Sequence, residues 1–314
     1  MSGSAADRRI RSLRPPKPKV DPYKAHGSVI DEERRPGATI ERALTVFLAG
    51  AECPFTCSFC DLWQWTIDGA TPNGALVRQL EDVLGTLGEP SPDRLKLYNA
   101  SNFFDRRAVP IADHAAIAAL AAPFTGITVE SHARGIGPDV VDFARRLNGR
   151  LEVAIGLETV HADAMAHLNK RLDFDRFDRA ADDLAAHDID LRVFVLLGTP
   201  YVRAEESVEW TMRSVEYALA RGAAVVSIIP VRGGNGELER LASLGHFTSP
   251  TLTELESALD QCLFLGPGVV TADCWDAERL AACDTCRPAR LQRLRRLNVS
   301  GRSEPRVACA ECAS

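Results

Sequence analysis

Residues 44–63 read LTVFLAGAECPFTCSFCDLW and carry the strongest signal for the fold. The first seven are nearly all apolar, as expected for a strand buried on both faces of a sheet. Three cysteines, Cys53, Cys57 and Cys60, follow in the loop after this strand. Three thiols are too few for a closed structural zinc site, which takes four ligands. They fit a [4Fe–4S] cluster in which one iron lacks a protein ligand.

Strand-like and helix-like segments alternate along the chain beyond this stretch. Apolar runs typical of buried strands occupy residues 94–100, 126–132, 151–158, 191–198, 223–230 and 268–275. Segments with helical spacing alternate with them, at 73–87, 111–122, 138–147, 174–187, 204–221 and 251–264. This order predicts an α/β protein with right-handed crossovers and a parallel sheet, either doubly wound or curled into a partial, open β/α barrel. In such barrels the chemistry lies at the C-terminal ends of the strands.

Charge is unevenly distributed over the 314 residues. The formal net charge is −6, yet residues 1–40 hold nine Lys/Arg against five Asp/Glu, and residues 283–314 hold seven against three. Basic ends on an acidic body favour a polyanionic partner, or they are solvated tails. No run approaches the ~20 apolar residues of a membrane span, and the N-terminal residues lack the apolar core of a secretory signal. We therefore expect a cytoplasmic protein without a membrane partner.

The cysteine loop resembles that of the radical S-adenosylmethionine (radical SAM) superfamily. The C-x3-C-x2-C spacing follows the first barrel strand in that family, and an aromatic residue, here Phe59, commonly precedes the third cysteine. The resemblance implies a partial barrel over residues 41–275 and a [4Fe–4S] cluster on Cys53, Cys57 and Cys60. It implies reductive cleavage of S-adenosylmethionine (SAM) to a 5′-deoxyadenosyl radical that abstracts hydrogen from a substrate. A flavodoxin or ferredoxin would supply the electron.

The same resemblance points to SAM-binding residues at other strand ends. VAIGLET, residues 153–159, resembles the G-x-E strand end of the subclass with the methylthiotransferases and the Elongator catalytic subunit, and so implies that Glu158 holds SAM. Arg171 matches the arginine that pairs with the SAM carboxylate. The remaining predicted cofactor contacts, carried over by position only, are Phe59, Asn99, Ser101, Glu130, Gly198 and Ile229. The RGGNG segment, residues 232–236, is either a loop that closes over substrate or a long turn.

Two C-x2-C pairs near the C-terminus predict a second metal site. They are Cys283 with Cys286 and Cys309 with Cys312. Four thiols suit either a structural zinc or an auxiliary [4Fe–4S] cluster, and the residues alone do not separate the two. Cys262 reads as a core residue, and Cys274, which follows Asp273 at a strand end, reads either as a buried structural thiol or as a hydrogen donor to a substrate radical.

The chain therefore divides into three segments. Residues 1–40 read as an extended basic arm, because their PPKPK run disfavours a helix. Residues 41–275 form the barrel, and residues 276–314 form the four-cysteine segment.

The barrel segment most resembles bacterial Fe–S oxidoreductases related to the archaeosine-biosynthesis radical SAM protein. That resemblance implies a modified base in RNA as substrate. One alternative is a small-molecule or natural-product oxidoreductase or lyase with an auxiliary cluster. The other is a non-catalytic, metal-stabilised binding module.

Overall fold

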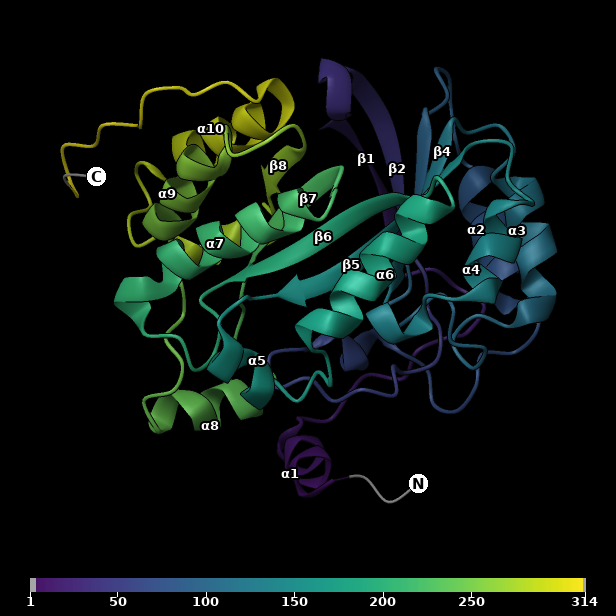
Figure 1. The fold of residues 1–314 in the computed structure, drawn as a ribbon, viewed down its shortest axis with the longest axis horizontal. Helices are drawn as coiled ribbons and strands as arrows, with labels where there is room; N and C mark the ends of the chain where they lie inside the picture. Colours follow the sequence, from purple (N-terminus) through teal and green to yellow (C-terminus); the bar gives the residue numbers. More distant parts are fainter. Residues whose placement is uncertain (1–3, 313–314) are drawn as a thin grey trace.

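The computed structural model describes residues 4–312. One sheet of eight strands runs in sequence order from β1 to β8; β1 is antiparallel to β2, and every later pair is parallel. The strands curl into a nearly closed barrel with one open seam, between β1 and β8 (Figure 1). The strand bounds are β1 Gly27–Arg34, β2 Ile40–Phe47, β3 Arg94–Tyr98, β4 Gly126–Ser131, β5 Arg150–Glu158, β6 Asp190–Leu197, β7 Val225–Pro230 and β8 Val269–Ala272. The prediction of a partial, open β/α barrel is confirmed.

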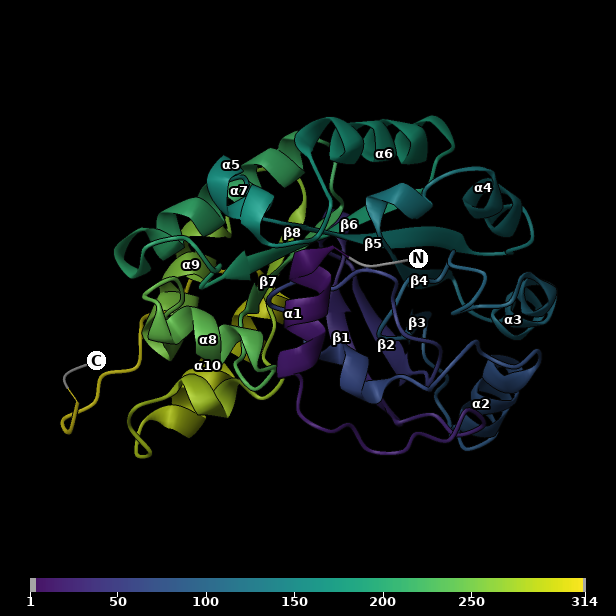
Figure 2. The same ribbon diagram turned by 90° about the horizontal axis from the view of Figure 1, so that it is seen from below.

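Helices cover the outside of the barrel and one of its ends. The helix bounds are α1 Ala5–Leu13, α2 Ala75–Leu84, α3 His114–Leu120, α4 Pro138–Ala144, α5 Ala162–His167, α6 Phe174–Ala186, α7 Ser207–Ala220, α8 Glu237–Ser243, α9 Leu252–Cys262 and α10 Arg287–Ser300. Figures 1 and 2 show α1 and α8 at the end of the barrel where the parallel strands finish, which we call the barrel mouth. No helix within residues 4–312 is long and apolar enough to cross a membrane.

Apolar side chains fill the space between the strands and the surrounding helices. Leu97, Val129, Val153 and Val193 are 0% exposed, one from each of four neighbouring strands. Alternate residues of the same strands point into the barrel, because side chains on a strand alternate between its faces. The main hydrophobic core therefore lies outside the sheet, and the barrel interior is left for polar and functional groups.

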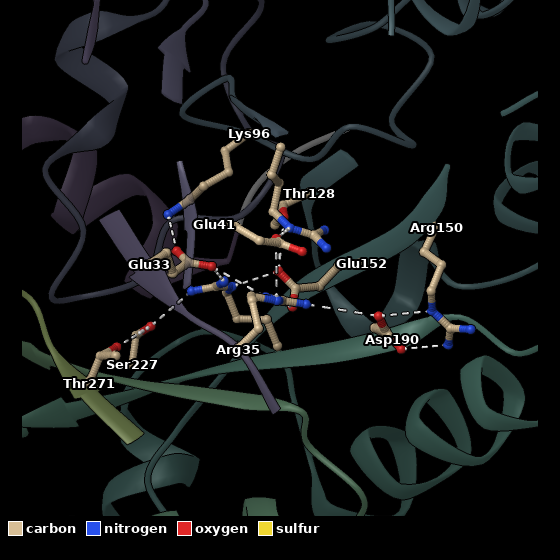
Figure 3. A network of polar contacts seen from close by, with 12 residues as sticks. Glu33, Arg35, Glu41, Lys96, Thr128, Arg150, Glu152, Asp190, Ser227 and Thr271 are labelled. Carbon is tan, nitrogen blue, oxygen red and sulfur yellow. Dashed lines mark hydrogen bonds and ion pairs between the residues drawn. The ribbon is translucent and has the colours of Figure 1, made fainter. Parts of the chain in front are cut away.

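Ion pairs close the end of the barrel opposite the mouth (Figure 3). Glu152 is fully buried and receives hydrogen bonds from Arg35 at 2.6 Å and Arg192 at 2.8 Å. Arg192 also pairs with Glu33 on β1, and Lys96 donates to Glu33 at 2.8 Å. Buried charges persist only when they are paired in this way. The network ties β1 to β5 and β6 across the barrel interior.

Helix α10 covers the seam. It contacts both β1 and β8. Asn298 on α10 accepts from the backbone N–H of Ala272 and donates to its carbonyl, both at 2.8 Å. A side chain thus satisfies part of the exposed edge of β8, which would otherwise be free to pair with another chain.

The prediction of an extended arm over residues 1–40 is wrong. Residues 5–13 form α1, capped by Ser4, and residues 27–34 form β1. The proline run disfavours a helix only where the prolines stand, and residues 14–20 between these two elements are indeed irregular. A hydrophobicity pattern does not reveal a charged strand such as GSVIDEER. The inward carboxylate of this strand, that of Glu33, is stabilised by ion pairs with Arg192 and Lys96 instead of by apolar packing.

Candidate active site

The three-cysteine loop follows β2 and lies at the barrel mouth. Cys53, Cys57 and Cys60 are free thiols and are half-buried. Within residues 4–312, the one group of metal-ligating atoms lying within 4.8 Å of one another is formed by the four C-terminal cysteines. The donor set of three thiols on one short loop fits a cluster of several metal atoms, in which each thiolate binds a different iron.

Backbone contacts from two distant segments fix the shape of this loop. Ser58 donates its N–H to the carbonyl of Leu168 at 2.9 Å. Asn169 donates to the carbonyl of Thr56 at 2.8 Å, and Asn235 donates to that of Ser58 at 2.9 Å. The loop is thus held by the segment after α5 and by the loop before α8. Both anchors come from far along the chain, so the thiols take their positions only when the barrel is complete.

Phe59 anchors the same loop by packing. Its ring lies against an apolar cluster around α8, whose buried members are Leu196, Val231, Leu238, Leu241 and Phe247. The aromatic residue before the third cysteine therefore has a clear structural role, beside the cofactor contact that the sequence predicts for it.

Helix α1 grips the loop through Asp7, which is 4% exposed. The carboxylate accepts hydrogen bonds from Thr56, from Asn169 at 3.0 Å and from the backbone of Ser4 at 2.7 Å, and it pairs with Arg171. Burial alone would raise the pKa of Asp7, but the hydrogen bonds from Thr56, Asn169 and Ser4 outweigh it and hold that pKa well below its ordinary value. The N-terminal segment is therefore part of the site.

We expect Asp7→Ala to loosen the loop. Removal of the Asp7 carboxylate leaves the Thr56 hydroxyl and the Arg171 guanidinium without their acceptor. This should lower folding stability by about 1–3 kcal/mol. Mutation of a group that orients metal ligands typically lowers metal affinity by about 10–100-fold. The rate of iron loss to a chelator should therefore rise by that factor. Arg11→Ala, at an exposed position on the same helix, should leave the rate unchanged; equal rates for the two variants would contradict this role for Asp7.

A buried ion pair lies beside the three thiols. Lys170 donates to Glu158 at 2.6 Å, and the two side chains are 11% and 6% exposed. Burial disfavours the Lys170 ammonium, but the charge of Glu158 outweighs it and holds the pKa of Lys170 above its ordinary value. The Lys170 nitrogen also lies 6.0 Å from the centre of the Phe59 ring. A fixed cation and a fixed anion thus stand next to the cysteine loop.

Gly156 makes room for this pair. A Cβ atom at this position would lie 2.0 Å from the Glu158 carboxylate and 2.7 Å from the Lys170 nitrogen. Glu158 itself has a positive φ of 70° at a register shift between β5 and β6. Such a conformation is strained for a residue with a side chain and is typical of functional sites. The G-x-E pattern therefore has a direct physical meaning here.

Arg171 does not face the same way as Lys170. Its side chain is 46% exposed and pairs with Asp7 of α1. The sequence assigned the SAM carboxylate to Arg171, whereas the structure brings its neighbour Lys170 together with Glu158.

His132 supports the segment that carries Lys170. Its ring stacks on Phe55 of the cysteine loop, with centroids 4.1 Å apart. Its Nδ1 accepts from the Arg134 N–H, which leaves Nε2 to donate to the Lys170 carbonyl at 3.0 Å. Burial and the nearby Lys170 charge lower the pKa of His132 to about 3. The imidazole is therefore neutral and positions its neighbours, without serving as an acid at neutral pH.

Burial raises the pKa of all three loop thiols to about 12. Without metal they are protonated and poorly nucleophilic, since the thiolate is the reactive form. Metal binding must displace these protons. This environment suits ligands and not a free cysteine nucleophile.

Aromatic side chains line the barrel interior between the mouth and the ion-pair network. Phe47, Tyr98 and Phe194 point inward from three strands, with centroids 6.5 Å apart for Phe47 and Tyr98 and 6.3 Å apart for Tyr98 and Phe194. Trp275, which is 63% exposed, extends the row, with its ring 5.5 Å from that of Phe47. The three inward rings are only partly buried, although the outward residues of their strands are closed to solvent. The interior at this level is thus partly accessible to solvent.

Glu130 points into the same space from β4. Burial raises its pKa to about 7, against backbone hydrogen bonds from Asn99 and Ala100 that act in the opposite direction. At neutral pH the carboxyl can therefore donate or accept a proton. A group of this kind in a partly accessible interior is a candidate for substrate recognition or acid–base chemistry.

The raised pKa predicts a pH-dependent stability. Because the folded pKa lies above the unfolded value of about 4.5, the contribution of Glu130 is fully present below that value and is lost as the pH rises through about 7. Between about pH 5 and about pH 8, the unfolding free energy of Glu130→Gln should fall by at most about 2–3 kcal/mol less than that of the wild type. We therefore expect its melting temperature to decline less steeply with pH. Glu81→Gln, on the exposed face of α2, should keep the wild-type profile. An unchanged profile for Glu130→Gln would contradict the assignment.

The other predicted contacts occupy varied places. Asn99 is 0% exposed, and neither atom of its amide has a hydrogen-bond partner; the Ser101 hydroxyl also lacks one. These orphaned polar atoms at the end of β3 suit a ligand. Gly198 has a φ of 75° and packs closely on Pro250, so it serves the turn. Ile229 is half-buried and packs against the apolar cluster around α8.

Three further residues of the site escape sequence reasoning. Asp7 lies in a segment without periodicity, Lys170 stands beside the arginine that the family pattern favours, and Asn235 lies in the RGGNG segment. Asn235 is 2% exposed and holds the cysteine loop, so this segment acts as a clamp on that loop instead of a free lid.

Comparison with known proteins identifies the fold. The sequence matches no protein-family model and no curated protein. Among solved structures, spore photoproduct lyase in complex with a dinucleoside spore photoproduct is similar, with a TM-score of 0.51 and 12% identity over 72% of this chain and 75% of that one. Methylornithine synthase gives a TM-score of 0.50 and 12% identity, over 71% of this chain and 62% of that one.

A radical SAM methyltransferase from Kitasatospora setae, solved with cobalamin and a [4Fe–4S] cluster, gives a TM-score of 0.44 and 13% identity. It is aligned over 63% of this chain, which spans only 38% of that protein. These solved structures are radical SAM enzymes. The likeness is one of fold: this chain has the partial barrel of the radical SAM enzymes.

Proposed function

We propose that this protein is a radical SAM enzyme. The observation that carries the proposal is the pairing of two features at the barrel mouth. Three half-buried thiols on one clamped loop lie next to a buried Glu158–Lys170 pair. A centre with three cysteine ligands leaves one iron for a small molecule. The ion pair offers one anionic and one cationic group for a zwitterionic ligand.

Cys53, Cys57 and Cys60 would hold the cluster. When bound and reduced, a [4Fe–4S] cluster supplies the electron that cleaves SAM to methionine and a 5′-deoxyadenosyl radical. The protein contributes binding, orientation and exclusion of water, as is general for enzymes whose cofactor performs the difficult step. A flavodoxin or ferredoxin is the proposed electron donor.

Residues of this chain would orient the amino-acid end of SAM. The Lys170 ammonium can donate to a carboxylate, and the Glu158 carboxylate can accept from an ammonium or from ribose hydroxyls. Lys170 would exchange the Glu158 carboxylate for a carboxylate of the ligand. Glu158 would exchange the Lys170 ammonium for an ammonium of the ligand, so that neither charge is left buried and unpaired. The unpartnered amide of Asn99 and hydroxyl of Ser101 can supply further hydrogen bonds.

For the substrate we propose a modified base, in RNA or as a smaller fragment. The support is the aromatic interior of Phe47, Tyr98 and Phe194, since flat bases stack on such rings. Glu130 can accept from, or donate to, the polar edge of a base. The structural neighbour spore photoproduct lyase is complexed with a dinucleoside, and the resemblance to the archaeosine-related oxidoreductases points the same way.

The basic charges at the two ends of the chain do not support binding to RNA. Arg9, Arg14 and Lys17 pair with Glu237, Glu52 and Asp68 of the same chain. At the other end Arg290 and Arg293 are buried in ion pairs with α9. These charges hold the N- and C-terminal segments to the barrel.

Product analysis tests the proposed activity. The protein is reconstituted with iron and sulfide without oxygen, reduced and mixed with SAM. We expect 5′-deoxyadenosine and methionine in equal amounts. A verified load of about four irons per chain with neither SAM binding nor cleavage would overturn the proposal and favour a non-catalytic binding module.

A further inference from the structure

The four C-terminal cysteines form a site built for a single metal ion. The sulfur atoms of Cys283 and Cys309 lie 3.9 Å apart, and those of Cys286 and Cys312 lie 3.7 Å apart. All four ligand atoms lie within 4.8 Å of one another. The four cysteines form no disulfide with one another, because the two separations are far beyond the ~2.05 Å of a disulfide bond.

These distances match tetrahedral zinc. Four thiolates at about 2.3 Å from one ion lie about 3.8 Å from one another. In a [4Fe–4S] cluster each cysteine binds a different iron, so the iron–iron separation adds to the sulfur–sulfur distance. Four sulfurs gathered this tightly leave no room for a cubane between them. We propose that Cys283, Cys286, Cys309 and Cys312 bind one structural zinc ion and not an auxiliary cluster.

The surrounding contacts are those of a structural metal site. Cys283–Cys286 forms a turn that leads directly into α10, and Cys309–Cys312 forms a second turn. The backbone N–H groups of Glu311 and Cys312 are directed at the Cys309 sulfur, and Arg290 is directed at that of Cys286. Such second-layer hydrogen bonds orient and stabilise metal ligands.

The polypeptide that delivers the second pair is fastened along its length. After Gly301, whose φ of 61° reverses the chain at the end of α10, the C-terminal segment runs back along that helix. Arg293, with a side chain 1% exposed, donates to the carbonyls of Glu304 and Pro305. Arg306 pairs with Asp260 on α9 at 3.2 Å. The metal closes this otherwise irregular segment onto the helix that covers the barrel seam.

Zinc has no accessible redox chemistry, so this site cannot take an electron from a product radical. A zinc ion at this site therefore excludes the alternative function of a small-molecule oxidoreductase or lyase that uses an auxiliary iron–sulfur cluster here. It does not depend on SAM cleavage, and it can succeed or fail whatever the reaction at the barrel mouth. Figures 1 and 2 both place the C-terminal segment apart from α1 at the barrel mouth.

Metal analysis of matched variants tests the proposal. Wild-type protein, reconstituted without oxygen, should hold about one zinc and about four irons per chain. Cys57→Ala/Cys60→Ala should lose the iron and keep the zinc. Cys309→Ser/Cys312→Ser should lose at least about nine-tenths of the zinc and keep the iron. Cys274→Ser, at a cysteine outside both groups, should keep both metals. About eight irons and no zinc in the wild type, falling to about four in Cys309→Ser/Cys312→Ser, would overturn the proposal.

A second measurement covers the case in which the C-terminal variant fails to fold. X-ray absorption at the zinc edge of Cys57→Ala/Cys60→Ala protein should show four sulfur neighbours at about 2.3 Å. Zinc with nitrogen or oxygen neighbours, or protein that holds no zinc, would contradict the assignment.

Discussion

Cys57→Ala should fold like the wild type and form no 5′-deoxyadenosine. The unmetallated thiol is neutral and half-buried, and the backbone hydrogen bond directed at its sulfur comes from Cys57 itself. We expect a change in folding stability of less than about 1 kcal/mol for the metal-free protein. Two remaining thiols cannot hold the proposed centre, so both the cluster absorbance and SAM cleavage should be lost.

The matched control is Cys274→Ala. Cys274 is also half-buried, but it follows β8 and lies outside both cysteine groups. This variant should keep the cluster and the wild-type rate of 5′-deoxyadenosine formation. If Cys57→Ala retained that rate, the three-cysteine loop would not hold the reactive centre.

Lys170→Met should weaken both the fold and SAM binding. Removal of the ammonium leaves the Glu158 carboxylate, 6% exposed, without its partner at 2.6 Å. Breaking a buried pair in this way costs about 3–5 kcal/mol. The melting temperature should fall accordingly, and Glu158→Gln/Lys170→Met should recover part of the loss, because no charge then remains unpaired. SAM affinity of the folded fraction should drop by about 10–100-fold, as expected for a lost charged hydrogen bond of about 1.5–3 kcal/mol.

Arg171→Met separates the structural assignment from the sequence assignment. The two basic residues are adjacent, but Arg171 is 46% exposed and bound to Asp7. If Lys170 receives the SAM carboxylate, Arg171→Met should change SAM affinity by less than about threefold, while it loosens α1. A larger loss of affinity for Arg171→Met than for Lys170→Met would show that the family pattern, and not the observed pair, marks the binding residue.

The sequence predicted the barrel well, because the outward-facing residues of its parallel strands are apolar and fully buried and so mark each strand. The run at 126–132 became β4 Gly126–Ser131, and the helical spacing at 174–187 became α6 Phe174–Ala186. The elements that were missed lack such a signal. Strand β1 faces the barrel interior with Glu33, whose charge is neutralised by Arg192 and Lys96. Helices α5 and α8 are short, and no helical segment is expected at their residues.

The candidate site was predictable only where local spacing carries the chemistry. The two cysteine groups are visible as C-x3-C-x2-C and C-x2-C patterns. Asp7 and Asn235 act on the cysteine loop from 49 and 177 residues away, and no local pattern reports such contacts. The choice of zinc for the C-terminal thiols likewise depends on the distances between their sulfur atoms. The spacing of four cysteines in a sequence does not give those distances.

Electron paramagnetic resonance of the reduced protein tests the central claim most directly. The claim is that Cys53, Cys57 and Cys60 hold a cluster whose fourth iron is free to bind SAM. Addition of SAM should shift the g-values of the reduced cluster, and SAM labelled with ¹⁵N in its amino group or ¹⁷O in its carboxylate should show hyperfine coupling to it. A fully loaded, reducible cluster whose spectrum is unchanged by SAM, with no coupling to either label, would contradict the account.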